Sequence, residues 1–244
     1  MDILSIKFDF QKGGPFCGSH SLIMNIGGCN LRCSGYGQEY QNSKGKIVQG
    51  CPYYMNVDKH TFQNNWKNVK TLSKIKRVIK SLSPPKTKYD FIITGGEPLL
   101  YWNTAFFQSL IEGAIQSGHR VIIETNASRD ISFEFAYQSD IVFSQSLKIF
   151  SSGEMRAKAI NMRTLKSIKR NAKNKFYRIL SSELTWREDF IDIEDILFRT
   201  LKVFPHDIWL TPIPGNNNED FKKNRLFLRS KALQYGFNFD DSIK

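Results

Sequence analysis

The sequence has no long apolar segment. No run of hydrophobic residues approaches the ~20 residues that a membrane-spanning helix needs. The first residues include polar and acidic side chains at the positions where a signal peptide has its apolar core. These two absences argue against a membrane or exported protein, and we expect a cytoplasmic one.

Cysteine and histidine are scarce. Four cysteines in 244 residues, without an export signal, argue against a disulfide framework and favour metal binding or catalysis. The four histidines, His20, His60, His119 and His206, form no spaced pair, so we expect none of them to be a ligand. No internal repeat or low-complexity linker is present, and the length suits one sizeable core.

Acidic residues are fewer than basic ones, 23 against 35, and the net charge is +12. Such a balance favours anionic partners, such as nucleic acid, an acidic metabolite or an acidic electron-transfer protein. Between residues 155 and 178, however, the cations alternate with apolar residues at helical spacing, including Met162, Leu165 and Ile168. This pattern indicates a solvated helix face, so direct nucleic-acid binding is the less favoured interpretation.

Strand and helix signals alternate along the chain. The predicted strands are 21–26, 90–94, 120–124, 140–143, 176–180 and 207–210, and the predicted helices are 58–82, 106–118, 155–172, 185–202 and 219–236. Residues 1–16 are expected to form a short extended entry and a glycine-rich turn. Residues 30–56 are expected to form one long polar loop, and loops of this length are usually functional or disordered.

This alternation predicts right-handed βαβ units and a parallel sheet, arranged as an open or partial barrel in a single α/β domain, residues 1–244. Functional residues of such folds gather at the carboxyl ends of the strands. The two conspicuous motifs of the sequence both follow predicted strands, so we expect them to meet at this end.

The first motif is a group of cysteines after the first predicted strand. Cys29 and Cys33 lie four residues apart, and Cys51 follows in the same polar loop. Soft thiolates select iron–sulfur clusters or zinc. Unrelated buried thiols are the third interpretation of this spacing.

The second motif is a glycine–glycine–glutamate–proline turn at residues 95–98, directly after strand 90–94. Glycines let the backbone approach a ligand closely. The carboxylate of Glu97 can accept a hydrogen bond from an ammonium group.

Together, residues 28–33 and 95–98 resemble the cluster loop and the glycine-rich turn of the radical S-adenosylmethionine (SAM) enzymes. Four further stretches resemble the 7-carboxy-7-deazaguanine synthase family: 11–16, 124–126, 144–153 and the segment from 211 onward. The resemblance covers nearly the whole chain and implies a partial (β/α)6-type radical SAM barrel, with a cluster loop at about 27–57 and a closing helix at about 219–236.

The resemblance also implies three sets of site residues. Three cysteines would hold a [4Fe-4S] cluster, a second set would bind SAM, and a third would bind the substrate, with one lysine both catalytic and substrate-binding. The ligands are Cys29, Cys33 and Cys51; the SAM set is Gly95, Gly96, Glu97, Pro98, Glu124, Thr125, Asn126, Ser144 and Ser146; the substrate set is Gln11, Gly14, Asn25 and Lys148.

The sequence departs from the family pattern at several positions. Tyr36 stands near the place of the third cysteine, so the assignment of Cys51 requires an inserted loop, and Cys17 is left out. Tyr53 replaces the threonine that contacts Mg²⁺ in the family, and a phenol is a poor ligand for this ion, which counts against magnesium. Asn25 replaces the arginine that reaches the substrate.

The implied reaction converts 6-carboxy-5,6,7,8-tetrahydropterin to 7-carboxy-7-deazaguanine, with ring contraction and loss of ammonia, through the 5′-deoxyadenosyl radical obtained from SAM. The product would serve the 7-deazaguanine (queuosine) pathway, for tRNA or for modified DNA. The composition, rich in Lys, Asn, Ile and Phe, suits an AT-rich genome, which is compatible with a phage origin. The resemblance also implies a flavodoxin- or ferredoxin-type electron donor and a homodimer. Two alternatives are a different pterin or deazapurine substrate, and a non-catalytic, zinc-stabilised nucleic-acid-binding protein.

Overall fold

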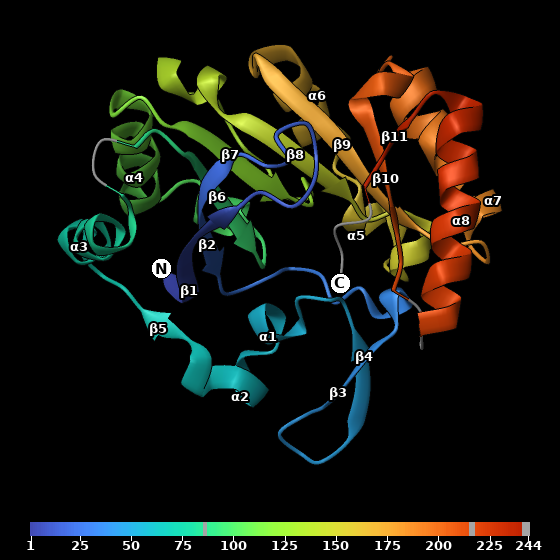
Figure 1. Ribbon diagram of the computed structural model, residues 1–244, viewed down its shortest axis with the longest axis horizontal. Coiled ribbons are helices and arrows are strands. Elements are labelled where there is room, and N and C mark those ends of the chain that lie inside the picture. The colour runs from blue at the N-terminus through green and yellow to red at the C-terminus, as the bar shows by residue number, and fades with distance from the viewer. Residues whose placement is uncertain (85–86, 215–217, 241–244) are drawn as a thin grey trace.

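The computed structural model describes residues 1–84, 87–214 and 218–240, and one mixed sheet runs through them (Figure 1). Its nine strands within these ranges follow the order β11-β10-β9-β8-β7-β6-β2-β1-β5. All neighbours from β2 to β11 are parallel, whereas β1 is antiparallel to β2 and β5 is antiparallel to β1. The strands are β1 (Asp2–Phe10), β2 (His20–Ile26), β5 (Lys67–Asn68), β6 (Asp90–Gly95), β7 (Arg120–Thr125), β8 (Val142–Leu147), β9 (Asn174–Ser181), β10 (Ile208–Pro212) and β11 (Asn238–Phe239).

Helices connect most of the parallel strands. The α-helices are α1 (Tyr54–Val57), α2 (Lys59–Phe62), α3 (Leu72–Leu82), α4 (Ala105–Gln116), α5 (Arg156–Ala159), α6 (Met162–Asn171), α7 (Trp186–Asp192) and α8 (Asn218–Tyr235). The short 3-10 helices are η1 (Ser34–Tyr36), η2 (Gln63–Asn65), η3 (Pro98–Tyr101), η4 (Ala136–Asp140), η5 (Phe150–Ser152) and η7 (Pro205–Asp207), and η6 (Ile193–Thr200) is a π-helix. No helix in the described ranges is both long and apolar enough to cross a membrane.

The two faces of the sheet carry different apolar clusters. On β6, Phe91 and Ile93 belong to the main core, together with buried residues of the connecting helices such as Phe107. Ile92 points to the other face and joins a smaller cluster with residues of β7, β8 and β9. This alternation follows from the two-residue period of a strand, and it determines which residues at the strand ends point away from the helices.

The predicted architecture is confirmed. An open parallel sheet is present, each predicted strand has a counterpart, and α8 forms the closing helix. The largest shift is in β8, which spans 142–147 rather than 140–143, so Ser144 and Ser146 lie within the strand and not after it. The predicted basic helix is divided into α5 and α6.

The single helix predicted over residues 58–82 is wrong. The segment holds α2, the short 3-10 helix η2 and α3, and β5, between η2 and α3, pairs with the edge of β1. Trp66 is extended, its indole N–H donates to the carbonyl oxygen of Met55 at 2.9 Å, and its ring covers Gly27. Pairing with the free edge of β1 thus overrides the helical spacing of the apolar residues.

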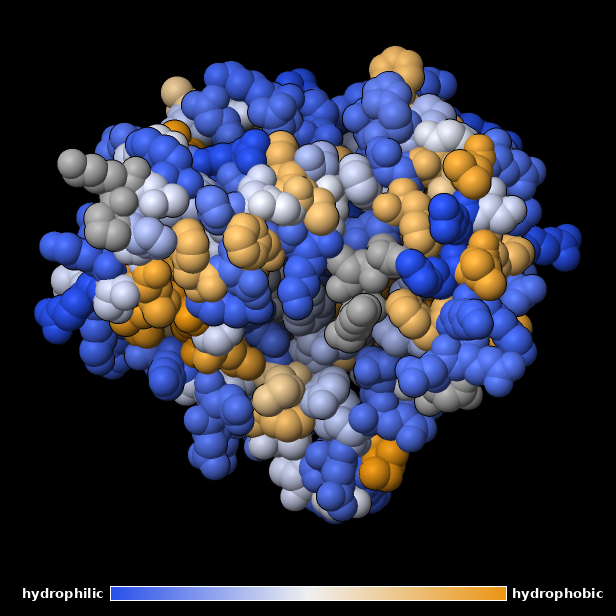
Figure 2. All heavy atoms as spheres, viewed as in Figure 1, coloured by the Kyte–Doolittle hydropathy of each residue, from blue (hydrophilic) through white to orange (hydrophobic). Residues whose placement is uncertain are grey.

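Two segments have more regular structure than was expected. Most of residues 1–16 form β1, and the polar loop 30–56 contains the hairpin of β3 (Gln38–Gln41) and β4 (Ile47–Gly50), which projects from the body of the molecule (Figure 1). The hairpin is held to the segment that follows it by Tyr40, which stacks on Tyr54 at 4.5 Å and donates to Asp58 at 3.2 Å. Polar residues cover most of the face shown in Figure 2.

Candidate functional site

The site lies on the sheet face that carries the small apolar cluster, which we call the inner face. Its side chains follow that cluster toward the carboxyl ends of the strands. Two residues after each inner-facing apolar residue comes a polar one: Asn25 on β2, Thr94 on β6, Glu124 on β7, Ser144 on β8 and Arg178 on β9. Because parallel strands present their carboxyl ends at one edge, these polar side chains gather there.

Two adjoining cavities lie at this edge. The inner cavity is lined by most of the predicted cluster and SAM residues, and the outer cavity, of about 360 Å³, opens beside β1 and β2. Tyr53, Thr94, Glu124 and Arg178 line both cavities and form the wall between them. The predicted residues in the inner cavity are Cys29, Cys33, Cys51, Gly95, Gly96, Glu124, Thr125, Asn126, Ser144, Ser146 and Lys148.

The three predicted ligand cysteines share the inner cavity, although Cys51 follows the inserted hairpin. Desolvation raises the pKa values of Cys29 and Cys33 to about 12 and also raises that of Cys51. The thiols are therefore protonated until a metal binds, and binding releases their protons. Cys17 is exposed and donates its S–H to the carbonyl oxygen of Lys12, as expected for a residue outside the ligand set.

The arrangement of the thiols bears on the kind of metal. In the described part of the chain, no three Cys, His, Asp or Glu side chains are placed to hold a single metal ion. A zinc site needs its ligands around one atom, whereas a four-iron cluster distributes its ligands over the corners of a cube. The three soft donors line one cavity, as either kind of metal centre requires.

The glycine–glycine–glutamate–proline turn fits closely against the cluster loop. The N–H of Gly96 donates to Ile26 at 3.0 Å, and the N–H of Glu97 donates to the carbonyl oxygen of Gly28 at 2.7 Å. A Cβ on Gly96 would lie 1.9 Å from that same oxygen of Gly28, so only glycine fits at this position. The turn therefore fixes the start of the cluster loop.

Glu97 is fully buried and lies outside the lining of the inner cavity. Its carboxylate accepts hydrogen bonds from the Leu99 N–H at 2.9 Å, the Thr125 hydroxyl at 2.5 Å and the Asn126 N–H at 2.7 Å. Burial raises the pKa of Glu97, although these hydrogen bonds oppose the shift. In this structure Glu97 joins the ends of β6 and β7, and Pro98, also buried, begins the helix η3.

The remaining SAM residues point into the inner cavity. The Asn126 amide nitrogen lies 3.8 Å from the Cys29 sulfur and 3.3 Å from the Asn30 side-chain oxygen. The buried hydroxyl of Ser144 has no hydrogen-bond partner within the described ranges, as expected for a group that faces a ligand. Ser146 accepts a hydrogen bond from Lys148 at 2.7 Å.

The predicted substrate residues do not form one group. Gln11 and Asn25 line the outer cavity, whereas Lys148 lies in the inner one, 5.4 Å from the centre of the Tyr36 ring. Gly14 lines neither cavity, and a Cβ there would lie 3.3 Å from the ring of Phe176. Its positive φ of 76° gives it a role in the turn.

Arg178 is a site residue that the sequence analysis missed. Its guanidinium lies 3.1 Å from Glu124 and 3.0 Å from Asp240, and these two carboxylates raise its pKa although burial opposes the shift. Phe176 points to the inner face of the sheet, and side chains two residues apart on a strand point to the same face. The sequence spacing from Phe176 could therefore have placed Arg178 in the site. Nearby Tyr53 is neutral, because desolvation and Glu124 raise the pKa of its phenol to about 12.

Comparisons with known proteins agree with this site. The family described as "4Fe-4S single cluster domain" matches residues 18–174. A 7-carboxy-7-deazaguanine synthase from Hyperthermus butylicus is 32% identical over 124 residues, which are 51% of this chain and 42% of that protein. The chain therefore spans less than half of the curated relative that it matches.

Two solved structures share the fold. The crystal structure of QueE from Escherichia coli has a TM-score of 0.62 at 15% identity, over 98% of this chain and 92% of QueE. SuiB from Streptococcus suis has a TM-score of 0.52 at 14% identity, over 89% of this chain and 47% of SuiB. These findings confirm the predicted resemblance and support an enzyme. The chain belongs to the 4Fe-4S single cluster domain family, and it resembles proteins of the 7-carboxy-7-deazaguanine synthase type.

Proposed function

We propose that this chain is a radical SAM enzyme that converts 6-carboxy-5,6,7,8-tetrahydropterin to 7-carboxy-7-deazaguanine and ammonia. The observation that carries the proposal is the pair of adjoining cavities, one lined by three thiols and the other by polar side chains of β1 and β2. The conversion is redox-neutral overall, so it needs SAM as a cofactor and not as an oxidant.

In this proposal Cys29, Cys33 and Cys51 hold a [4Fe-4S] cluster, which when bound and reduced supplies the reductive cleavage of SAM. Three protein ligands leave one iron of the cluster free for SAM. The chain's own residues would orient SAM in the inner cavity and exclude water from it. Glu97 and Pro98 stay in the predicted SAM set although they lie outside the lining of this cavity. The members that line it are Gly95, Gly96, Glu124, Thr125, Asn126, Ser144 and Ser146.

The outer cavity is assigned to the pterin. Its volume of about 360 Å³ lies in the usual range for small-molecule sites. Gln11 and Asn25 present amide groups that suit the donors and acceptors of a pterin ring, and Lys7 and Lys12 add positive charge for its carboxylate. Lys148 would bind a carboxylate of the substrate at the inner end of the site.

Magnesium is not part of the proposal. Tyr53 stands at the wall between the cavities as a neutral phenol, and Mg²⁺ prefers carboxylate, carbonyl and water oxygens. An acidic flavodoxin or ferredoxin as electron donor suits the net charge of +12. A homodimer, a cytoplasmic location and a product destined for tRNA or phage DNA stay predictions.

The deciding experiment is an anoxic turnover assay. The protein is reconstituted with iron and sulfide, then incubated with SAM, dithionite and the carboxypterin, and products are read by mass spectrometry with and without Mg²⁺. We expect 7-carboxy-7-deazaguanine in both cases. Deoxyadenosine without this product would instead support the alternative of a different pterin or deazapurine substrate, which the replacements at Asn25 and Tyr53 favour. A protein that loads only zinc and does not bind SAM would refute the radical SAM assignment.

A further inference from the structure

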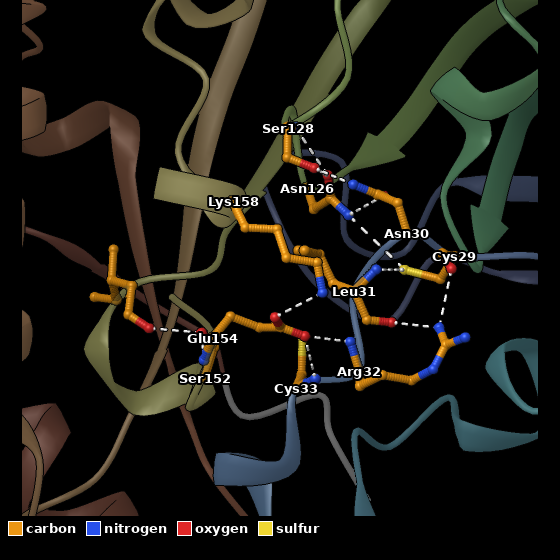
Figure 3. Close-up of polar contacts among 11 residues, drawn as sticks. Cys29, Asn30, Leu31, Arg32, Cys33, Asn126, Ser128, Ser152, Glu154 and Lys158 are labelled. Carbon is orange, nitrogen blue, oxygen red and sulfur yellow. Dashed lines mark hydrogen bonds and ion pairs between the residues drawn. The ribbon is translucent and has the colours of Figure 1, made fainter. Parts of the chain in front are cut away.

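A carboxylate from outside the cluster loop binds the backbone of that loop. Glu154 follows β8 and the turn η5, and Figure 3 shows its side chain pointing at the segment between the first two cysteines. One carboxylate oxygen accepts hydrogen bonds from the backbone N–H groups of Arg32 and of Cys33, the latter at 3.0 Å. The other oxygen accepts from the ammonium group of Lys158 at 3.1 Å.

The contact between these two loops is too close for larger residues. A Cβ on Gly35 would lie 2.4 Å from the carbonyl oxygen of Ser151 and 2.7 Å from the nitrogen of Gly153. Cys33 itself has a φ of 47°, in the left-handed region that non-glycine residues rarely adopt. Such a conformation persists only where the surroundings hold it, and here Glu154 binds the N–H group of that very residue.

Glu154 also places a negative charge beside a cluster ligand. Its side chain is only 9% exposed, whereas that of Lys158 is 44% exposed, so solvent screens the lysine more than the carboxylate. Hydrogen bonds to the sulfurs and the net charge nearby determine the potential of an iron–sulfur cluster. A fixed carboxylate disfavours the added electron of the reduced state.

We propose that Glu154 is a positioning residue for the [4Fe-4S] cluster, which holds Cys33 in its ligating conformation and lowers the reduction potential of the cluster. The inference rests on the cluster ligands of the proposed function. Lys158 partly offsets the charge of Glu154, so the two side chains influence the potential in opposite directions. The guanidinium of Arg32, which belongs to the loop itself, donates to the carbonyl oxygens of Cys29 and Leu31 (Figure 3).

The first test is a redox titration of the reconstituted, full-length protein, followed by electron paramagnetic resonance. Glu154→Gln keeps an oxygen that accepts from both N–H groups and removes the charge, so we expect full iron content and a more positive potential. Lys158→Gln removes the opposite charge and should make the potential more negative. Shifts of the same sign, or no shift in Glu154→Gln, would overturn the proposal.

The second test needs no cluster. In the cluster-free protein, Glu154→Ala should accelerate hydrogen exchange at the Arg32 and Cys33 amides on the order of tenfold, because each loses a charged hydrogen-bond acceptor. Lys158→Gln is the matched control and should leave both rates unchanged. Unchanged exchange in Glu154→Ala would refute the positioning role, even if the cysteines prove not to be the ligands. If Glu154→Ala does not fold, the reduction potential of Glu154→Gln still tests the proposal.

Discussion

The replacement of Arg178 by methionine tests how much the buried ion network contributes to the site. Arg178 lies between the carboxylates of Glu124 and Asp240, and the three side chains are 15%, 21% and 3% exposed. Methionine retains part of the side-chain volume and leaves both carboxylates without the guanidinium. Removal of one partner from a buried ion pair costs about 3–5 kcal/mol, because a charge stays in a poorly solvated place.

We expect Arg178→Met to lower the free energy of unfolding by about 3 kcal/mol, the lower end of this range. The reason is that Glu124 lines both cavities, where water can solvate it. For a protein of this size, such a loss corresponds to a fall in melting temperature of roughly 6–12 °C. The free energy of unfolding is measured by urea denaturation of the cluster-free protein. Arg178→Lys should lose less, since it keeps the charge.

Arg156 provides a matched control. It also joins two carboxylates, Asp192 and Asp195, but its side chain is 52% exposed. Surface ion pairs contribute about 0–1 kcal/mol, so Arg156→Met should be nearly neutral. If Arg178→Met and Arg156→Met lose equal stability, burial does not determine the strength of the network and the reasoning fails.

Three further predictions concern the cluster loop and the metal. Gly96→Ala should abolish cluster loading, measured as bound iron, because its Cβ meets a carbonyl oxygen of that loop, whereas Gly113→Ala, with open space around it, should load normally. Cys51→Ala should lose the cluster absorbance and Cys17→Ala should keep it; a full cluster in Cys51→Ala would refute the ligand assignment. Turnover should be the same with EDTA as with added Mg²⁺, because Tyr53 offers a neutral phenol, and a strict magnesium requirement would contradict this.

Local patterns were sufficient to predict the strands β2 and β6 to β10 and the motifs that follow them. A short buried run such as residues 90–94 has few alternatives to a strand. The turn at 95–98 needs glycine because a Cβ on Gly96 would lie 1.9 Å from the carbonyl oxygen of Gly28. The cavity that unites Cys29, Cys33 and Cys51 agrees with the spacing argument, although a hairpin separates the last two. The ligand assignment itself awaits the iron measurements.

Predictions failed where distant segments compete for the same residues. The apolar spacing over 58–82 is helical, yet β5 pairs with the edge of β1 because unpaired backbone groups there accept it. The contacts of Glu97 were not predicted either: its oxygens bind groups at the ends of β7 and in η3, which depends on which strands are neighbours. Whether it also reaches SAM stays a prediction.

The sequence by itself determined the class of fold, the succession of the strands β2 and β6 to β10 along the chain, and the chemistry available at their ends, because periodicity and residue type are local properties. Only the tertiary structure decided which of these groups meet. Arg178 on β9 contacts Glu124 on β7 and Asp240 just after β11, and Glu154 reaches the loop of Cys33 across more than a hundred residues. Such contacts depend on the register and packing of the whole sheet, which no local pattern records.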